Sequence, residues 1–138
     1  MSGFYVTVSN KVGEDPSSFT CNLAEPIDLD SGYAVALVEL HLLDKAFSKI
    51  TKCKIDLSCV TPSQSSGTYE RLLRIVDLRD NSWEASDLRP HYTPVMGTIT
   101  RQLKFDIRQL GNNLPPAFSR DAIIYLTLHF VPYFCATL

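Results

Sequence analysis

Two residues with the potential for chemistry, Glu39 and His41, lie two positions apart in the apolar run SGYAVALVELHLL, residues 31–43. A carboxylate beside an imidazole can act as a general acid–base pair when a third group completes the site. The sequence contains no nucleophile elbow GxSxG, no P-loop, no HExxH and no dinucleotide-binding GxGxxG. We therefore interpret Glu39 and His41 as polar residues at the solvated end of a strand. We predict that the chain is not an enzyme and has no catalytic, cofactor-binding or metal site.

The other two histidines also have simpler structural interpretations. His91 lies between Pro90 and Tyr92 in a segment rich in turn residues, where we expect it to pack in an aromatic cluster with Tyr92 and Trp83. His129 falls on the outward face of the last predicted strand. We expect it to be structural or to lie at an interface.

Cysteine spacing gives no sign of a metal site or of a disulfide framework. Cys21, Cys53, Cys59 and Cys135 form no CxxC pair and show no metal-type spacing with the histidines. The beginning of the chain, MSGFYVTVSN, lacks the basic stretch of a signal peptide. We therefore expect reduced, buried thiols in a protein made in a cytosolic or nuclear compartment, with Cys21, Cys53 and Cys59 facing the core.

Arginines cluster in the middle of the chain, between residues 69 and 92, with aromatic residues interspersed among them. These residue types dominate the energetics of protein–protein interfaces, although a solvated face with arginine stems packed along it would look the same. The C-terminal VPYFCATL is a second candidate surface, because an apolar tail is costly to leave in water. The predicted interface candidates are Glu39, His41, Arg71, Arg74, Arg79, Trp83, Arg89, His91, Tyr92, Tyr133 and Phe134.

Length and composition are those of one globular domain, which we assign to residues 1–138. Hydrophobic residues make up 45% of the chain and charged residues 20%, which excludes a disordered tail. A net charge of -2 gives no general attraction to nucleic acid, so we expect no direct nucleic-acid binding. No run approaches the ~20 apolar residues that a membrane-spanning helix requires, so we expect no membrane span.

Alternation of apolar and polar residues, the period of a half-buried strand, recurs along the chain. It is clearest in residues 4–8, 19–23, 52–59, 102–108 and 122–130, and proline and glycine separate these runs. With residues 33–43, 71–78 and 91–95, the pattern predicts about eight short strands, typical of a sandwich or barrel. Residues 43–50 and 82–88 are predicted to hold at most a turn or two of helix. The serine-rich segment 61–70 is predicted to be an exposed loop.

The run that contains Glu39 and His41 is predicted to be a central strand. Density of valine and tyrosine favours a strand over a buried helix, and Gly32 marks its start. One face should carry Ala34, Ala36, Val38, Leu40 and Leu42 toward the core. The other face should carry Val35, Leu37, Glu39 and His41. Its first half should therefore be covered by other parts of the protein, and its second half should be exposed to solvent.

The order of motifs resembles virion proteins of Polinton/Maverick elements and adintovirus-like viruses. In the first half, the residues that match the family pattern are Phe4, Val6, Thr7, Phe19, Thr20, Leu23, Pro26, Ile27, Leu29, Gly32, Tyr33, Val35, Ala36, Leu37 and Glu39. In the second half, the matching segments are LLRIVDL (72–78), RPHYTPV (89–95), LKFDIRQLGNNLPPAF (103–118) and IIYLTLHF (123–130).

This resemblance implies an all-β fold, a single jelly roll with two four-stranded antiparallel sheets, of the kind found in penton proteins at capsid vertices. It also implies a structural protein of the virion that forms a homo-oligomer, with a pentamer favoured, and contacts the major capsid protein. The alternative is a ligand- or receptor-binding β-sandwich, such as a lectin-like module, without a role in assembly. Neither interpretation requires a cofactor.

Overall fold

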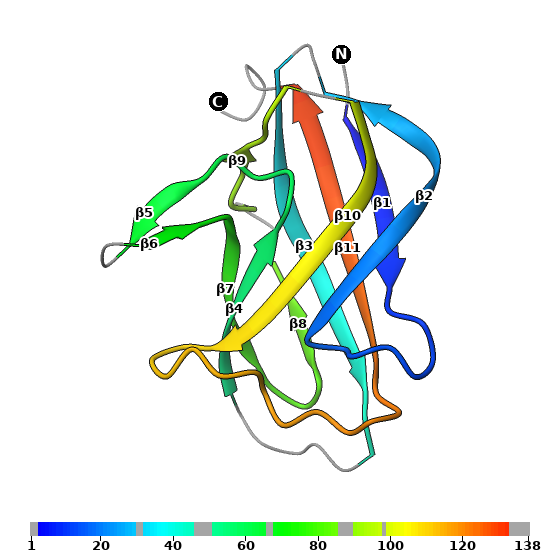
Figure 1. The fold of residues 1–138 in the computed structure, drawn as a ribbon, viewed down its shortest axis with the longest axis vertical. Coiled ribbons are helices and arrows are strands. Elements are labelled where there is room, and N and C mark those ends of the chain that lie inside the picture. The colour runs from blue at the N-terminus through cyan, green and yellow to red at the C-terminus, as the bar shows by residue number, and fades with distance from the viewer. Residues whose placement is uncertain are drawn as a thin grey trace.

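Eleven strands and no helix make up the regular structure of the residues described by the computed structural model, which are 3–29, 32–45, 51–65, 68–85, 90–97 and 99–132. Figure 1 shows their arrangement. No helix in these ranges is long and apolar enough to cross a membrane. The strands are β1 (Phe4–Ser9), β2 (Ser18–Asp28), β3 (Tyr33–Leu43), β4 (Thr51–Leu57), β5 (Ser63–Ser65), β6 (Thr68–Glu70), β7 (Leu72–Leu78), β8 (Ser82–Glu84), β9 (Thr93–Pro94), β10 (Ile99–Gln109) and β11 (Ile123–Pro132).

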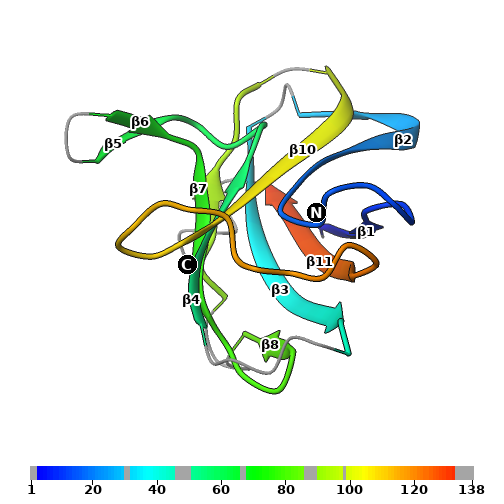
Figure 2. The same ribbon diagram turned by 60° about the horizontal axis from the view of Figure 1, so that its bottom comes forward.

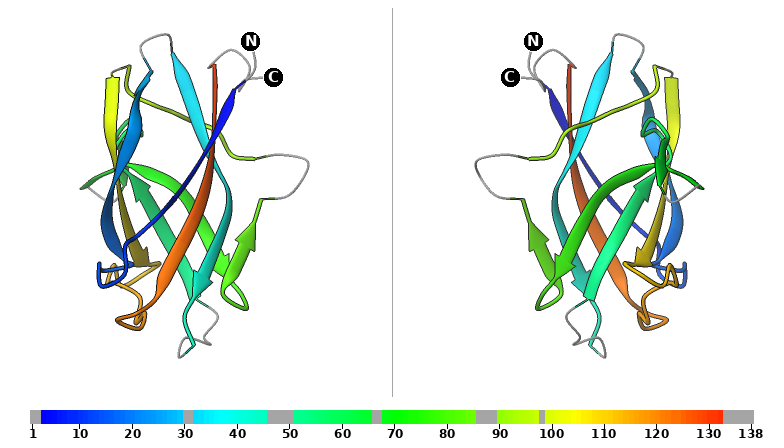
Figure 3. Two further views of the ribbon diagram at one scale, coloured as in Figure 1. Left: turned by 90° about the vertical axis from the view of Figure 1, so that its right-hand side faces the viewer. Right: turned by 90° about the vertical axis from the view of Figure 1, so that its left-hand side faces the viewer.

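Eight of these strands form two facing sheets with the strand order of a jelly roll (Figure 3). One sheet has the order β1-β11-β3-β8, with β9 also paired to β3, and the other has the order β2-β10-β4-β7. Within the eight, the first strand pairs with the last, β2 with β10, β3 with β8 and β4 with β7, all antiparallel. This is the path of a hairpin ribbon folded over on itself, so the jelly-roll prediction is confirmed.

The core lies between the two sheets and follows the predicted alternation on β4, β10 and β11. Phe105, Ile107, Leu126 and Leu128 are almost completely buried, as expected. Cross-strand pairs place apolar residues opposite one another, for example Phe105 opposite Leu57. Because directly opposed residues in a ladder share a face, each such pair contributes two side chains to the same layer of the core.

The predicted core face of β3 is wrong in its first half, because β3 contains a β-bulge. Glu39 pairs with Thr127 and Leu37 with Leu128, so Val38 has no partner on β11. Val35 and Leu37 therefore face the core before the bulge, and Leu40 and Leu42 face it after the bulge. The three residues that we expected in the core, Ala34, Ala36 and Val38, lie outside the core cluster; the two alanines are nevertheless buried, and Val38 is half-buried. Glu39 and His41 point outward, as predicted.

Three segments differ from their predicted local structure. Within the predicted loop 61–70, residues 63–65 and 68–70 form the paired strands β5 and β6, and this hairpin projects from the body of the sandwich (Figure 2). Residues 82–84 form the strand β8, not a helical turn, because Asp80 and Asn81 adopt positive φ angles and close a tight turn after β7. In the predicted strand 91–95, only Thr93 and Pro94 form β9. Of the predicted helical turn 43–50, Leu43 ends β3 and residues 46–50 lie outside the described ranges.

The buried cysteines are thiols with raised pKa values. Cys53 and Cys59 lie in the core, as predicted, whereas Cys21 is only partly buried. Burial, with a smaller contribution from the Asp77 carboxylate, raises the pKa of Cys53 to about 11. Burial also raises the pKa of Cys59 to about 12. Cys135 lies outside the described residues.

Deletion of Val38 should leave the fold intact and cost less than about 1.5 kcal/mol, which is the loss of one half-buried side chain. Glu39 then follows Leu37 directly, so Leu40 stays in phase with Leu37, and β3 can pair with β11 in the same register without a bulge. The free energy of unfolding is measured by urea denaturation.

The matched variant deletes Asp106 from β10, between two residues that face the core. Phe105 and Ile107 then point to opposite faces, so one of them must leave the core, and the deletion should cost at least about 3 kcal/mol. Equal losses of stability for the two deletions would show that Val38 is not the extra residue of β3.

Alkylation of Cys53 and Cys59 by iodoacetamide near pH 8 should be at least about 100-fold slower in the folded protein than in denaturant, because only the thiolate reacts. Peptide mass spectrometry gives the rate at each cysteine. These thiols stay protonated in the folded state above the usual pKa of 9.0, so the stability they contribute is complete below pH 9. It is lost as the pH rises through about 11 for Cys53 and about 12 for Cys59. Similar labelling rates with and without denaturant would contradict this placement.

Candidate functional site

Glu39 and His41 meet a third polar residue on the outward face of the sheet. Glu84, on the edge strand β8, pairs directly with Glu39 across the ladder. One ligand atom from each of the three residues lies within 4.8 Å of the other two, and no other group of three or more such residues occurs in the described part of the chain. Sequence analysis missed Glu84 because it placed residues 82–88 in a helical turn.

Hydrogen bonds connect this polar cluster to the neighbouring strand. His41 Nε2 lies 3.4 Å from Glu39 Oε2, and the Thr127 hydroxyl of β11 donates a hydrogen bond of 3.2 Å to Glu39 Oε1. Thr127 Oγ1 is also 3.4 Å from Thr7 Oγ1 on β1. The side chains of Glu39 and His41 remain 40% and 45% exposed, so the cluster is open to solvent. No lysine or arginine among the described residues forms an ion pair with Glu39 or Glu84.

His129 lies further along the same face, between two tyrosines. Its ring stacks on Tyr5 at a centroid distance of 4.2 Å, and its Nδ1 is 2.9 Å from the hydroxyl of Tyr92. Burial lowers the pKa of His129 and raises the pKa of Tyr92. The expected cluster of His91 with Tyr92 and Trp83 is wrong, because His91 is exposed and Tyr92 packs on His129. The contacts of Tyr92 with His129 hold the segment before β9 against the sheet.

The arginines of the middle segment contact groups of their own chain. Arg71 Nη1 donates to the carbonyl oxygen of Val60 at 2.9 Å, and Arg79 pairs with Asp77 at 3.1 Å. Arg74 lies over the ring of Trp83, 5.4 Å from its centroid. Their interface role remains a prediction, and the candidates Arg89, Tyr133 and Phe134 lie outside the described residues.

Contact between Arg74 and Trp83 closes one open side of the sandwich. β7 and β8 are the edge strands of the two sheets on that side. A bulge in β7 pairs Arg74 with the inward-facing Ile55, and Trp83 pairs with the inward-facing Leu40. The guanidinium and the indole therefore meet between the two sheets, where a cation–π contact covers the edge of the core.

On the opposite side, between the edge strands β1 and β2, the sandwich has an open groove of about 380 Å³. Cys21 donates a hydrogen bond from Sγ to the carbonyl oxygen of Ser9 at 3.3 Å across it. The lining is Val6, Thr7, Val8, Ser9, Lys11, Thr20, Cys21, Asn22, Leu23 and Ala24. Both apolar and polar side chains line this groove, and the outer edges of two strands border it, which suits it to another polypeptide.

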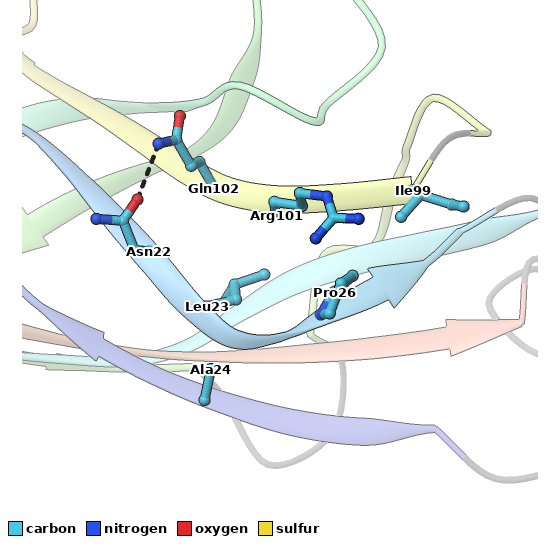
Figure 4. A pocket seen from close by; sticks show the side chains of 7 residues that line it. All are labelled: Asn22, Leu23, Ala24, Pro26, Ile99, Arg101 and Gln102. Carbon is cyan, nitrogen blue, oxygen red and sulfur yellow. Dashed lines mark hydrogen bonds between the residues drawn. The ribbon is translucent and has the colours of Figure 1, made fainter.

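A second hollow, of about 570 Å³, lies where β2 arches away from β10 (Figure 4). Thr100 pairs with Ile27 and Gln102 with Asn22, so four residues of β2 span the position opposite Arg101. Gln102 Nε2 donates to Asn22 Oδ1 at 2.8 Å and closes one end. The lining consists of Asn22, Leu23, Ala24, Pro26, Ile99, Arg101 and Gln102. The lining contains one guanidinium among apolar and amide side chains, so it has no acid–base pair. It is suited to contact with a partner molecule.

Hairpin β5–β6 is anchored firmly at its base and carries an exposed tyrosine. Glu70, at the end of β6, forms a 2.7 Å ion pair with Lys54, and both side chains are only 15% exposed. Burial, followed by repulsion from Glu70, raises the pKa of the neighbouring Asp56. Tyr69 is 79% exposed. The hairpin lies on the side of the molecule opposite β1 and β2 (Figures 1 and 2).

Comparison with solved structures shows the same fold in a viral protein. The chain is similar to the penton protein of mavirus, known from a crystal structure of selenomethionine-labelled protein, with a TM-score of 0.69. The match covers 95% of this chain and 99% of the mavirus chain, at 8% sequence identity. No protein-family model matches the sequence, and no curated protein matches it. At this identity the likeness shows the fold, which agrees with the jelly-roll strand order.

A double-mutant cycle on Arg74 and Trp83 should give a coupling of about 0.5–1 kcal/mol in the free energy of unfolding. We expect Arg74→Gln to destabilise the wild-type protein and to have little effect in a Trp83→Leu background, because the aromatic face is then absent. Urea denaturation of the four proteins provides the values. Arg79→Gln is the matched control, since Arg79 is 69% exposed and should contribute little in either background. A coupling of zero for Arg74 would show that the pair does not close the edge.

Proposed function

We propose that this chain is a penton-like structural protein of a viral capsid, from a virus or integrated element of the Polinton/Maverick and adintovirus kind. The observation that carries the proposal is the match in fold to the mavirus penton protein over 95% of this chain and 99% of that one. The ordered resemblance of the sequence motifs to virion proteins of the same elements supports it independently. The protein would act in the virion, as a self-assembling component that contacts the major capsid protein.

Self-assembly into a closed ring, with a pentamer favoured, requires two different surfaces on each subunit. In a ring, one side of each subunit meets the opposite side of the next, so the two surfaces must complement each other. The sandwich has two such sides. One carries the projecting hairpin β5–β6, and the other carries strands β1 and β2 (Figure 1), with the open groove between them.

The hairpin is suited to be the inserting element. Its base is held by the Lys54–Glu70 ion pair and by Arg71, which also contacts Met96 Sδ at 3.2 Å. Tyr69 therefore projects from a braced strand, and tyrosine is among the residues that contribute most to binding energy. A preorganised arm loses little conformational entropy when it docks into a neighbour. Tyr69 is not among the predicted interface residues; two that are, Arg79 and His91, have exposed side chains and would lie at the rim.

Size-exclusion chromatography with light scattering should find a ring of the purified protein, and Tyr69→Glu should shift it toward monomer. Loss of one interface anchor costs about 2 kcal/mol, which corresponds to about a 30-fold higher dissociation constant. Leu114→Glu is the matched control, since Leu114 is also exposed and lies in the connection from β10 to β11. Removal of residues 133–138 tests Tyr133 and Phe134 in the same assay.

A parent protein that stays monomeric at all concentrations, and binds a glycan in an array, would contradict the assembly role and favour the lectin-like alternative. A ring that is unchanged by Tyr69→Glu would contradict the hairpin as the inserting element. Far-UV circular dichroism of each variant separates loss of assembly from loss of folding.

A further inference from the structure

We propose that Glu39, His41 and Glu84 form a binding site for a divalent transition metal ion, for which zinc is the appropriate probe. Nothing in the proposed capsid role requires such a site, so the inference goes beyond that function and does not rest on it. It rests on the mixed donor set, on the placement of its members and on the charge that they leave unbalanced.

The donor set has the chemistry of a zinc site. Zinc binds imidazole nitrogen and carboxylate oxygen at about 2.0–2.2 Å and accepts three protein ligands with a fourth position open to water. The three ligand atoms lie within 4.8 Å of one another, so small side-chain rotations bring them around one ion. Calcium and magnesium prefer sites made of oxygen alone, so the imidazole of His41 favours a transition metal.

All three ligands come from regular strands, which hold them at defined positions. Glu39 and His41 are two residues apart on β3 and share its outward face, and Glu84 lies directly opposite Glu39 on β8. The bulge at Val38 turns Glu39 and His41 outward together. Outside the set, the Thr127 hydroxyl donates to Oε1 of Glu39, as residues behind a metal ligand commonly do, and Oε2 faces His41.

Charge balance also points to a cation. Two carboxylates directly opposite in a ladder repel one another, and within the described ranges neither forms an ion pair with a lysine or arginine. A bound divalent ion would remove this repulsion. It would also join the three-residue edge strand β8 to the central strand β3, and binding to the folded state alone would stabilise that state.

Isothermal titration of the full chain with zinc chloride, after treatment with a chelator, should show one ion bound per chain. Glu84→Gln and His41→Asn should each lower the affinity at least about 10-fold, because each removes one of three ligands. The matched controls are Glu25→Gln and His91→Asn, which change an exposed glutamate and an exposed histidine outside the cluster, and both should bind as the parent does. Magnesium should not compete with zinc.

Cobalt(II) spectra of the same proteins give a second readout, because the four cysteines could also attract a soft metal. The proposed site should give ligand-field bands without a thiolate charge-transfer band. Circular dichroism in the presence of chelator checks that each variant is folded before titration. A parent that binds no zinc, a thiolate charge-transfer band, or unchanged affinity in both Glu84→Gln and His41→Asn would overturn the proposal.

Discussion

A β-bulge in the central strand β3 accommodates one extra residue, Val38, so that apolar residues before and after it face the core. A strand of strict alternation that places Val35 and Leu37 in the core would also place Glu39 and His41 there, at the high cost of burying polar groups. Val38 has no partner on β11 and shifts the alternation by one, so Leu40 and Leu42 enter the core. The polar cluster and the apolar layer between the sheets both depend on this bulge.

The two sides of the sandwich, at the edge strands β7 and β8 and at the edge strands β1 and β2, differ in how far they are closed. This asymmetry supports the proposed assembly. A second bulge, in β7, brings Arg74 to the inner face, where it meets Trp83 and covers the edge of the core. The β1–β2 side keeps an open groove lined by apolar and polar side chains of two edge strands. Exposed strand edges invite pairing with another chain unless they are blocked. A subunit with one closed and one open side, and an arm opposite the open side, has the directionality that a ring requires.

A jelly roll shared with a viral protein at 8% identity is consistent with how such cores tolerate substitution. The requirement on each strand is that one face be apolar and of suitable volume, which many sequences satisfy. The fold does constrain which strands pair with one another across long stretches of sequence, such as β1 with β11 and β2 with β10. Function, in contrast, depends on surface residues that the fold leaves free to vary.

The sequence alone determined the features that depend on residues two positions apart in the same strand, which share one face of the sheet. Alternation predicted the buried faces of β4, β10 and β11, seven of the eight main strands, and the outward direction of Glu39 and His41. It could not show Glu84 beside them, because that contact depends on the register between β3 and β8, which a turn at Asp80 and Asn81 and the packing of Trp83 decide. Nor could it show the bulge at Val38. Valine and leucine suit either face of a buried strand, so only the burial of both sheets together decides which residue is left unpaired.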